Sequence, residues 1–242
     1  MCGRFTLSLG SFPADLAALL GLATVPVLES AWNVAPTQTV VIVRAHPDTG
    51  AREAVRVRWG LVPGWAKDPS IGSRLINARG ETVAEKPAFR AAFRRRRCLI
   101  LTTGFYEWRP SPPPAQPFFI RLAHGRPFAM AGLWDRWTGP DGVALDTCAI
   151  GTIEANAAMR PVHHRMPVIP DPADWGAWLD PAVTDPARIL PLVRACPAEW
   201  IVLHPVSTLV NNPRHDSPRL IEPVALTPPP DDLPFPPAGA GS

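Results

Sequence analysis

The chain has 242 residues, of which 46% are hydrophobic, and this length suits one large domain or two small ones with a sizeable core. Its net charge of +3 permits a nucleic-acid partner without requiring one. It has no apolar run near the ~20 residues of a membrane span, no apparent signal peptide, and no metal-ligand spacing among its cysteines and histidines. We therefore expect a cytoplasmic protein that uses no metal, no other cofactor and no membrane.

The predicted elements follow one another in a mixed order. From the N-terminus, the patterns indicate a helix over Ser11–Gly21, strands over Val40–Val43 and Ala54–Trp59, a loop over Gly60–Pro69, a helix over Glu81–Phe93, and strands over Cys98–Thr103, Phe118–Leu122, Phe128–Leu133 and Leu145–Thr152. Asp171 and Asp185 each precede a proline and predict the starts of two helices of about 8–10 residues, before a last strand over Trp200–Val206. Strands dominate the centre, spaced as in an antiparallel sheet or barrel, which favours an α+β fold.

Proline and arginine depart most from an average composition. Five of the 32 prolines lie in residues 110–117, which predicts an exposed loop between two strands. Seven more lie in residues 223–237, so we expect residues 224–242 to be a proline-rich disordered tail. Only two of the 24 basic residues are lysines. For the basic run Arg94–Arg97 we favour a role at the C-terminus of the preceding helix over a binding role.

Cys2 is the second residue of a chain that begins Met-Cys-Gly-Arg-Phe. A cysteine is small enough for the initiator methionine before it to be removed, and removal would leave a free α-amine and a thiol on adjacent carbons. This 1,2-aminothiol traps aldehydes, because the amine condenses to an imine and the thiol then closes a thiazolidine ring. The alternative is an incidental residue at the start site. Cys98, Cys148 and Cys196 lie in apolar stretches and are expected to pack as small hydrophobic side chains.

Three further polar side chains interrupt apolar or strand-like sequence. Glu107 follows a predicted strand and lies among aromatic residues, where partial loss of solvent suits a carboxylate to general acid/base chemistry. His163 lies in a loop or strand entry, and histidine is the natural proton shuttle near neutral pH. Asn77 follows an apolar pair, which indicates an amide that orients a substrate or another side chain. The plainer alternatives are a solvent-facing glutamate, a surface or core histidine, and a turn-forming asparagine.

Arg4, Arg79 and Arg165 each lie within two residues of one of these candidate catalytic groups. If those groups converge in the fold, the arginines converge with them and form a phosphate-binding rim around one pocket. Pro36 and Trp65 lie in Pro/Gly loops, and an apolar side chain beside a basic pocket is how proteins unstack a base. Packing of the two loops is the alternative role for Pro36 and Trp65.

Taken in order, the segments resemble the SRAP family, the SOS response-associated peptidases or abasic-site processing proteins. The resemblance spans about residues 2–223 and rests on MCGRF, WNVAP, WGLVPGWAKD, INARGETVAEKPAFR, RRCLILTTGFYEW, HHRMPVI and HPVSTLVNNPRHDSPRLIEP. Any one of these motifs is a weak signal, whereas the series in family order is specific. The resemblance implies a single α+β domain over residues 2–223, with a barrel-like, mostly antiparallel β core flanked by short helices.

The resemblance also implies a function. Members of the family bind single-stranded DNA and capture abasic sites as a thiazolidine DNA–protein crosslink at the N-terminal cysteine, which protects the site from strand cleavage. Their catalytic residues match Cys2, Asn77, Glu107 and His163 of this chain. Their DNA contacts match Arg4, Asn33, Arg79 and Arg165, with Pro36 and Trp65 as the wedge. The expected partner is therefore single-stranded DNA with abasic sites, bound by a monomer that associates with the nucleoid when on DNA.

This chain departs from the family pattern at two places near the candidate site. His164 stands where relatives carry an acidic residue, which bears on the tautomer or the pKa of His163. Thr102 and Thr103 stand where relatives carry Ala-Asp, which bears on the support of Glu107.

Three other functions stay open from the sequence. The family name suggests a cysteine peptidase, at least for removal of Met1, with Cys2, His163 and Asn77 as a thiol–histidine–amide set. An N-terminal-nucleophile amidotransferase also begins Met-Cys-Gly, although the later segments argue against it. The third is a non-enzymatic single-strand-binding module in which Cys2 is incidental. Adduct formation with an aldehyde, turnover of a peptide and a glutaminase assay distinguish these functions.

Overall fold

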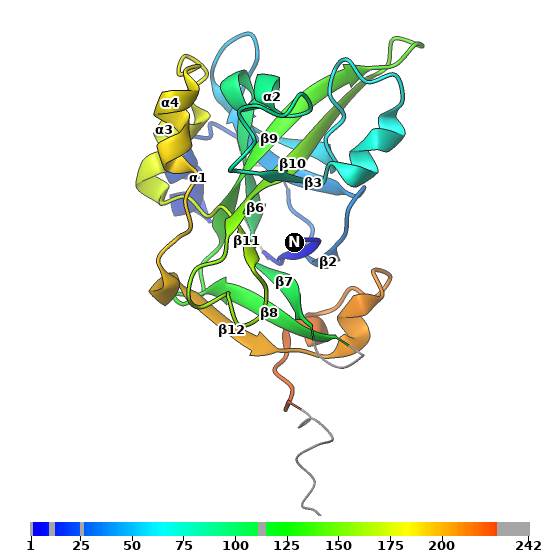
Figure 1. Ribbon diagram of the computed structural model, residues 1–242, viewed down its shortest axis with the longest axis vertical. Coiled ribbons are helices and arrows are strands. Elements are labelled where there is room, and N and C mark those ends of the chain that lie inside the picture. Colours follow the sequence, from blue (N-terminus) through cyan, green and yellow to red (C-terminus); the bar gives the residue numbers. More distant parts are fainter. Residues whose placement is uncertain (1, 10–12, 25–26, 111–114, 227–242) are drawn as a thin grey trace, which may run out of the picture.

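The centre of the fold is a closed ring of five strands (Figure 1). The computed structural model describes residues 2–9, 13–24, 27–110 and 115–226. The strands of the ring are hydrogen-bonded in the order β4 (Arg52–Trp59), β3 (Thr39–Ala45), β6 (Arg97–Thr102), β9 (Phe128–Thr138) and β10 (Ala144–Glu154). β10 then pairs with β4 in parallel, while the other pairings of the ring are antiparallel. This confirms the predicted barrel-like, mostly antiparallel core, and closure leaves the ring without a free edge.

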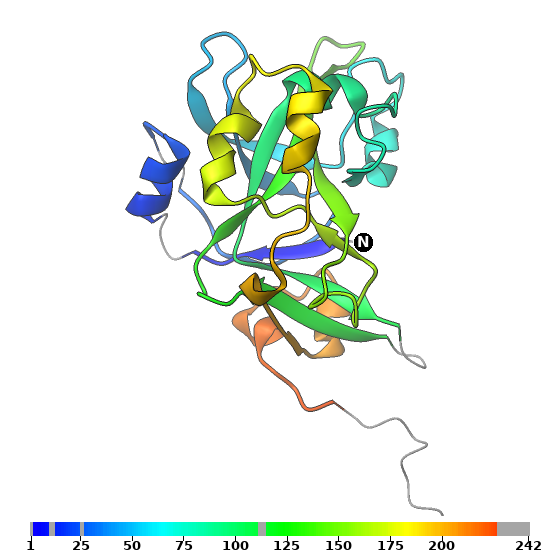
Figure 2. The ribbon, with the colours of Figure 1, turned by 60° about the vertical axis from the view of Figure 1, so that its left-hand side comes forward.

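A second, five-stranded antiparallel sheet lies below the ring in Figures 1 and 2. Its strands are hydrogen-bonded in the order β12 (Ile201–Pro205), β8 (Gln116–Leu122), β7 (Gly104–Arg109), β1 (Arg4–Leu7) and β2 (Ala31–Val34). A single residue separates β6 of the ring from β7 of this sheet, so the chain passes directly from one to the other. The N-terminal strand β1 is therefore an interior strand, with neighbours on both sides.

β10 continues past the ring and gathers two short strands. β5 (Asn77–Arg79) pairs with it in parallel, with Asn77 opposite Ile150. β11 (Arg165–Pro167) pairs with it in antiparallel fashion, with Arg165 opposite Glu154. Two candidate segments that are far apart in the sequence are thereby held on one strand.

The helices are short and lie around the strands. The α-helices are α1 (Ala14–Leu20), α2 (Arg90–Arg95), α3 (Trp175–Leu179) and α4 (Pro186–Ile189). The 3-10 helices are η1 (Pro69–Arg74), η2 (Pro172–Asp174), η3 (Leu190–Leu192), η4 (Ala198–Trp200), η5 (Thr208–Asn211) and η6 (Pro218–Ile221). Within the described residues, none of the helices is both long and apolar enough to cross a membrane.

The predicted starts at Asp171 and Asp185 are confirmed, but each helical stretch is divided between 3-10 and α-helical geometry. Both carboxylates accept a hydrogen bond from the backbone N–H two residues on, as helix-capping aspartates do. The first helix begins as the 3-10 turn η2 before α3, and the second reverts to 3-10 geometry in η3. Pro191 in η3 has no backbone N–H, so α4 cannot continue through it as a regular α-helix.

The predicted helix over Glu81–Phe93 is also wrong. Residues 81–85 form turns, and only Arg90–Arg95 is helical. Pro87 explains the difference, because it cannot donate a backbone hydrogen bond and it disfavours helical geometry at the residue before it. The hydrophobic positions of this segment still point inward, with Val83 and Phe93 buried.

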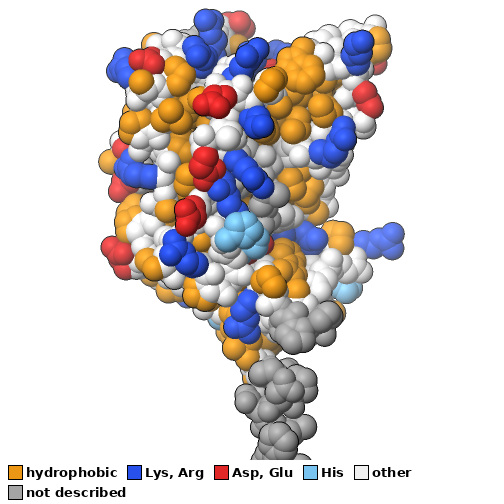
Figure 3. All heavy atoms as spheres, viewed as in Figure 1, with side chains coloured by type: hydrophobic (Ala, Val, Ile, Leu, Met, Phe, Trp, Pro, Cys, Tyr) orange, Lys and Arg blue, Asp and Glu red, His pale blue; other side chains and the backbone are white. Residues whose placement is uncertain are grey.

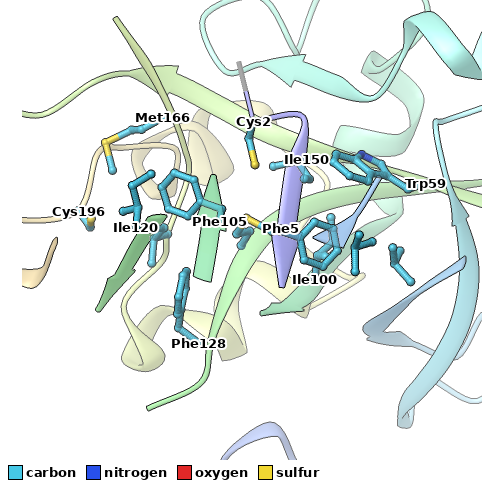
Figure 4. Packing of buried hydrophobic residues seen from close by; sticks show 14 of the residues in the cluster. Cys2, Phe5, Trp59, Ile100, Phe105, Ile120, Phe128, Ile150, Met166 and Cys196 are labelled. Carbon is cyan, nitrogen blue, oxygen red and sulfur yellow. The ribbon is translucent and has the colours of Figure 1, made fainter. Parts of the chain in front are cut away.

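Three packed clusters of apolar side chains fill the described part of the fold. Phe5 of β1 packs against Trp59 of β4 with ring centroids 5.2 Å apart, which joins the second sheet to the ring. Cys98, Cys148 and Cys196 are buried, as predicted. Figure 4 shows Cys196 among the apolar side chains of the largest cluster. Most of the predicted proline-rich tail, residues 227–242, lies outside the described residues.

Gly60 provides a test of the loop that leads to β5. Its φ is +124°, and a Cβ there would lie 2.7 Å from the backbone oxygen of Gly72. We expect Gly60→Ala to lower the free energy of unfolding by about 2–4 kcal/mol, because it combines backbone strain with overpacking. Gly50, at φ +72° with nothing within 4 Å of a Cβ, is the matched control. Gly50→Ala should cost only about 1 kcal/mol of strain in the same urea titration, and equal losses would contradict the steric argument.

Candidate active site

Strand β1 delivers the N-terminal residues to the strand that carries Glu107. Arg4 lies opposite Tyr106 and Phe5 opposite Phe105 in the register of β1 and β7. The next position outward along β7 is Glu107, beside the segment that contains Cys2. The Cys2 side chain is fully buried, and Glu107 is 3% exposed. Glu107 is thus not on the solvent face of the strand end, and it comes together with Cys2.

Asn77 holds the backbone of Cys2. Its side-chain Nδ2 donates a 2.9 Å hydrogen bond to the carbonyl oxygen of Cys2. The other side-chain atom, Oδ1, is buried and has no hydrogen-bond partner in the part of the chain that the structure describes. A buried acceptor without a donor is costly unless a partner arrives. Asn77 therefore fixes the second residue and presents an acceptor beside it.

His163 lies half-buried in the loop that ends at β11. The backbone N–H of Arg165 lies 2.9 Å from its Nδ1 and the Arg165 carbonyl oxygen lies 3.2 Å from the same nitrogen, so the backbone of Arg165 holds this edge of the ring. The ring of His164 stacks on it, with centroids 4.3 Å apart and the planes 27° from parallel. The loop is held by the backbone N–H of Ala155, which donates to the His164 carbonyl. These contacts fix the orientation of His163.

The charge of Glu107 reaches both Cys2 and His163. Burial raises the pKa of the Cys2 thiol well above its usual range, and the carboxylate of Glu107 raises it further. Burial also lowers the pKa of His163, while Glu107 opposes that shift and His164 adds slightly to it. At neutral pH the site therefore holds a neutral thiol and a neutral imidazole beside buried Glu107.

Arg4 and Asn33 form a buried polar network that ties the N-terminus to the C-terminal part of the chain. Nη1 of Arg4 donates to Asn33 Oδ1 at 2.7 Å and to the carbonyl of Val210 at 2.8 Å. Asn33 Nδ2 donates to the carbonyls of Asn212 and His215 at 3.1 and 2.8 Å. Asn33 is 3% exposed, so this network occupies its amide. Residues 210–215 include no predicted site residue, and only the fold reveals that their backbone carbonyls hold Arg4 and Asn33.

Arg165 is also occupied, in this case by an acidic side chain. It forms a bidentate ion pair with Glu81, with nitrogen–oxygen distances of 2.5 and 2.9 Å, and it donates to the carbonyl of Thr152. Glu81 was not predicted as a site residue, although it stands two positions after Arg79 in a conspicuous polar segment. Arg79 is exposed, and its side chain has no ion pair or hydrogen bond within the described residues.

The two predicted wedge residues differ in exposure. The side chain of Trp65 is 62% exposed, so it is not packed within its loop. Pro36 is half-buried at the end of β2. Thr37 follows it with φ +73°, a left-handed conformation that is strained for a β-branched residue. Such strain is typical of loops that hold a functional geometry.

The side chains of the two threonines that depart from the family pattern both form hydrogen bonds. Thr102 Oγ1 donates to the carbonyl of Thr6 at 2.9 Å. Thr103 Oγ1 shares a 2.8 Å hydrogen bond with Thr6 Oγ1 and accepts one from the backbone N–H of Ser8. These bonds join the bend between β6 and β7 to β1. The strand that carries Glu107 is therefore supported without an acidic residue at this bend.

Comparison with known proteins places the chain in a family. Residues 1–213 match the model of "SOS response associated peptidase (SRAP)". The chain is 40% identical over 225 residues to abasic site processing protein YoqW of Bacillus subtilis (strain 168), covering 92% of this chain and 99% of that protein. It is 34% identical to abasic site processing protein HMCES of Gallus gallus, covering 81% of this chain and 66% of that protein. The chain belongs to the SRAP family.

The fold agrees with this assignment. A solved structure from Bacteroides thetaiotaomicron superposes with a TM-score of 0.78 at 24% identity, covering 91% of this chain and 100% of that chain. At this identity the likeness concerns the fold alone. The predicted α+β class and the predicted family are thus both confirmed.

The ion pair between Glu81 and Arg165 predicts a pH-dependent stability. The Arg165 guanidinium lowers the pKa of Glu81, so the pair stabilises the fold above the unfolded pKa of about 4.3 and is lost as the pH falls through the lower folded value. We expect Glu81→Gln to lower the free energy of unfolding by about 1–2 kcal/mol at pH 7, since solvent screens the Glu81 side chain, which is 44% exposed. Urea unfolding of both proteins should show this difference shrinking toward pH 3.

Glu154→Gln is the matched control. Glu154 pairs with Arg160 at 3.1 Å, but the two side chains are 74% and 67% exposed. Its loss should have no measurable effect at either pH. A difference for Glu81→Gln that did not change with pH would contradict the ion-pair interpretation.

Proposed function

We propose that this protein captures abasic sites in single-stranded DNA as a thiazolidine crosslink to Cys2 after Met1 is removed, and so protects the strand from cleavage. The relatives named above are abasic site processing proteins, which supports the substrate class. The observation that carries the proposal is the hydrogen bond from Asn77 to the Cys2 carbonyl beside buried Glu107. Buried polar groups thus position the second residue of the chain.

The first step opens the sugar. An abasic site exchanges between a closed hemiacetal and an aldehyde at C1′, and a proton given to the ring oxygen promotes opening. Because Nδ1 of His163 faces the backbone of Arg165, Nε2 is the nitrogen that transfers the proton. The protonated ring is the acid, and the nearby charge of Glu107 favours that form against the effect of burial.

The second step joins the amine to the aldehyde carbon. The Cys2 ammonium, with a reference pKa of about 7.7–8.0, gives a proton to Glu107. The free amine attacks C1′, water leaves, and an imine remains. The unpartnered Oδ1 of Asn77 is an acceptor for a hydrogen of this amine or for a sugar hydroxyl, which holds the nucleophile in line.

The third step closes the ring. The Cys2 sulfur adds to the imine carbon while its proton passes to the nitrogen, so the product is protein plus DNA minus one water. The raised pKa of the thiol keeps sulfur protonated until the imine forms, which gives the amine the first attack. Closure consumes the imine that would otherwise permit β-elimination, so the strand stays intact.

The DNA-binding residues fall into two groups in this proposal. Arg79 and Trp65 are exposed and are the direct contacts, one to phosphate and one as the wedge beside Pro36. Arg4, Asn33 and Arg165 form the floor of the DNA-binding surface, where their mutual and neighbouring contacts hold them in place.

The peptidase alternative finds less support in this site. Cysteine peptidases rely on a thiol whose pKa is lowered by a positive neighbour. Here burial and the negative charge of Glu107 both raise the pKa of the Cys2 thiol. In an amidotransferase or a passive DNA-binding module, the hydrogen bond from Asn77 to the Cys2 carbonyl would not serve aldehyde capture. The following experiments separate these functions.

Cys2→Ala should abolish the crosslink without abolishing DNA binding. Incubation with a single-stranded oligonucleotide that carries one abasic site, followed by a heated denaturing gel, measures the covalent product. Electrophoretic mobility without heating measures binding. Cys196→Ala removes another buried free cysteine and should retain the crosslink. A heat-stable adduct formed by Cys2→Ala would sink the proposal.

The pH dependence of crosslinking should identify His163 as the acid. The reaction requires a free amine and a protonated His163, so its rate should pass through a maximum and decline on both sides. The pKa of His163 is lowered by burial, so deprotonation at higher pH should cause the alkaline decline. His163→Gln should lower the maximum by about 10²-fold or more and remove that decline. An alkaline decline retained in His163→Gln would assign the acid to another group.

A further inference from the structure

The basic run after α2 contains more charge than the helix end uses. Arg97 is buried, and its Nη1 donates to the carbonyls of Phe93 and Arg94 at 2.9 and 2.7 Å. These are carbonyls of the last turn, so Arg97 alone supplies the predicted role at the helix C-terminus. Arg96 forms an ion pair with Asp135 at 3.1 Å. The structural roles of this run therefore belong to Arg96 and Arg97.

Three arginines of the same segment stay without such a role. Arg90, Arg94 and Arg95, hereafter the α2 patch, are exposed, and none forms an ion pair or side-chain hydrogen bond within the described residues. Arg90 and Arg94 are four positions apart on the helix, where like charges repel and destabilise it. The patch and its neighbours Ala91 and Arg96 line an open hollow of about 390 Å³. A six-residue helix thus carries an uncompensated positive charge around a hollow.

The position of α2 relates this patch to the candidate site. In Figures 1 and 2, α2 lies above the N-terminus on the same side of the molecule. Figure 3 shows Lys and Arg side chains, with Asp and Glu side chains among them, between the end where α2 lies and the histidine surface in the middle of this face. Arg79 and Lys86, both exposed, belong to the segment of chain between β5 and α2.

We propose that the α2 patch is a second contact for the DNA backbone, which binds phosphates of the strand beyond the captured nucleotide. The inference rests on the proposed function and extends its DNA-binding surface. The planar guanidinium fork fits phosphate oxygens well. The aromatic residues of this segment, Phe89 and Phe93, are buried, so the patch offers no ring on which a base could stack. The contact is therefore to phosphate and independent of base sequence.

The test compares wild type with Arg90→Gln/Arg94→Gln/Arg95→Gln on two oligonucleotides. One has about 7 nucleotides and the other about 30, and each carries one abasic site near its centre. On the long oligonucleotide the variant should bind more weakly, and its slope of log affinity against log salt should be shallower by about 2 for three lost phosphate contacts. Between 50 and 200 mM salt, the advantage of wild type should shrink by about 15-fold. On the short oligonucleotide the two proteins should crosslink at the same rate.

Two further variants serve as controls. Arg90→Lys/Arg94→Lys/Arg95→Lys keeps the charges and should keep most of the salt slope. Arg56→Gln/Arg121→Gln/Arg126→Gln removes the same charge from surfaces outside the α2 patch and should leave the slope unchanged. Thermal unfolding should show that the α2 variant is at least as stable as wild type, since it loses the repulsion between Arg90 and Arg94.

The outcomes distinguish this inference from the proposed function. Equal affinities and salt slopes of wild type and the α2 variant on the long oligonucleotide would overturn the second contact, even if both proteins form the crosslink. The second contact would also be overturned if the α2 variant and the Arg56/Arg121/Arg126 variant lost the same amount of salt slope. Equal losses would reflect net charge alone. If wild type failed to crosslink both oligonucleotides, the proposed function would fail, whereas the salt slopes would still report on the patch.

Discussion

The hydrogen bond from the Asn77 side chain to the carbonyl of Cys2 is the contact on which the candidate site depends. It links the start of the chain to a short strand that is itself held by β10 of the barrel. The N-terminal strand is fixed from both sides by its sheet neighbours, so the second residue has a defined position in a buried place. The first residues of most chains are poorly ordered unless they are tied down. Here the fold ties down Cys2 beside Glu107, whose charge also acts on His163.

Burial gives this site its chemical character. The charge of Glu107, which has little access to water, acts on the neighbouring thiol and imidazole. It makes a thiolate at Cys2 unfavourable and it favours a protonated histidine. These preferences suit a reaction in which nitrogen attacks before sulfur. They suit a thiolate-first reaction poorly, because burial and then the charge of Glu107 raise the pKa of the Cys2 thiol.

Much of this protein was predictable from its sequence, because the signals were local. Alternating strands and capping aspartates predicted the barrel core and the starts of two helices. The hydrophobic pattern of residues 81–93 predicted a helix that does not form, because Pro87 lacks the backbone N–H that a helix interior requires. The network of Arg4 and Asn33 joins positions 177 to 206 residues apart, and no local pattern contains such partners. The ion pair between Arg165 and Glu81 could not be predicted either, because its partners are 84 positions apart in the sequence, although both stand in conspicuous segments.

Intact mass spectrometry tests the capture of abasic sites by Cys2 most directly. The purified protein would be weighed alone and after incubation with a single-stranded oligonucleotide that carries one abasic site. We expect the protein alone to lack Met1, and the mixture to contain a new species at the mass of protein plus oligonucleotide minus one water. A protein that lacks Met1 but forms no such species would contradict the aldehyde trap and would leave Cys2 to be tested on peptide substrates.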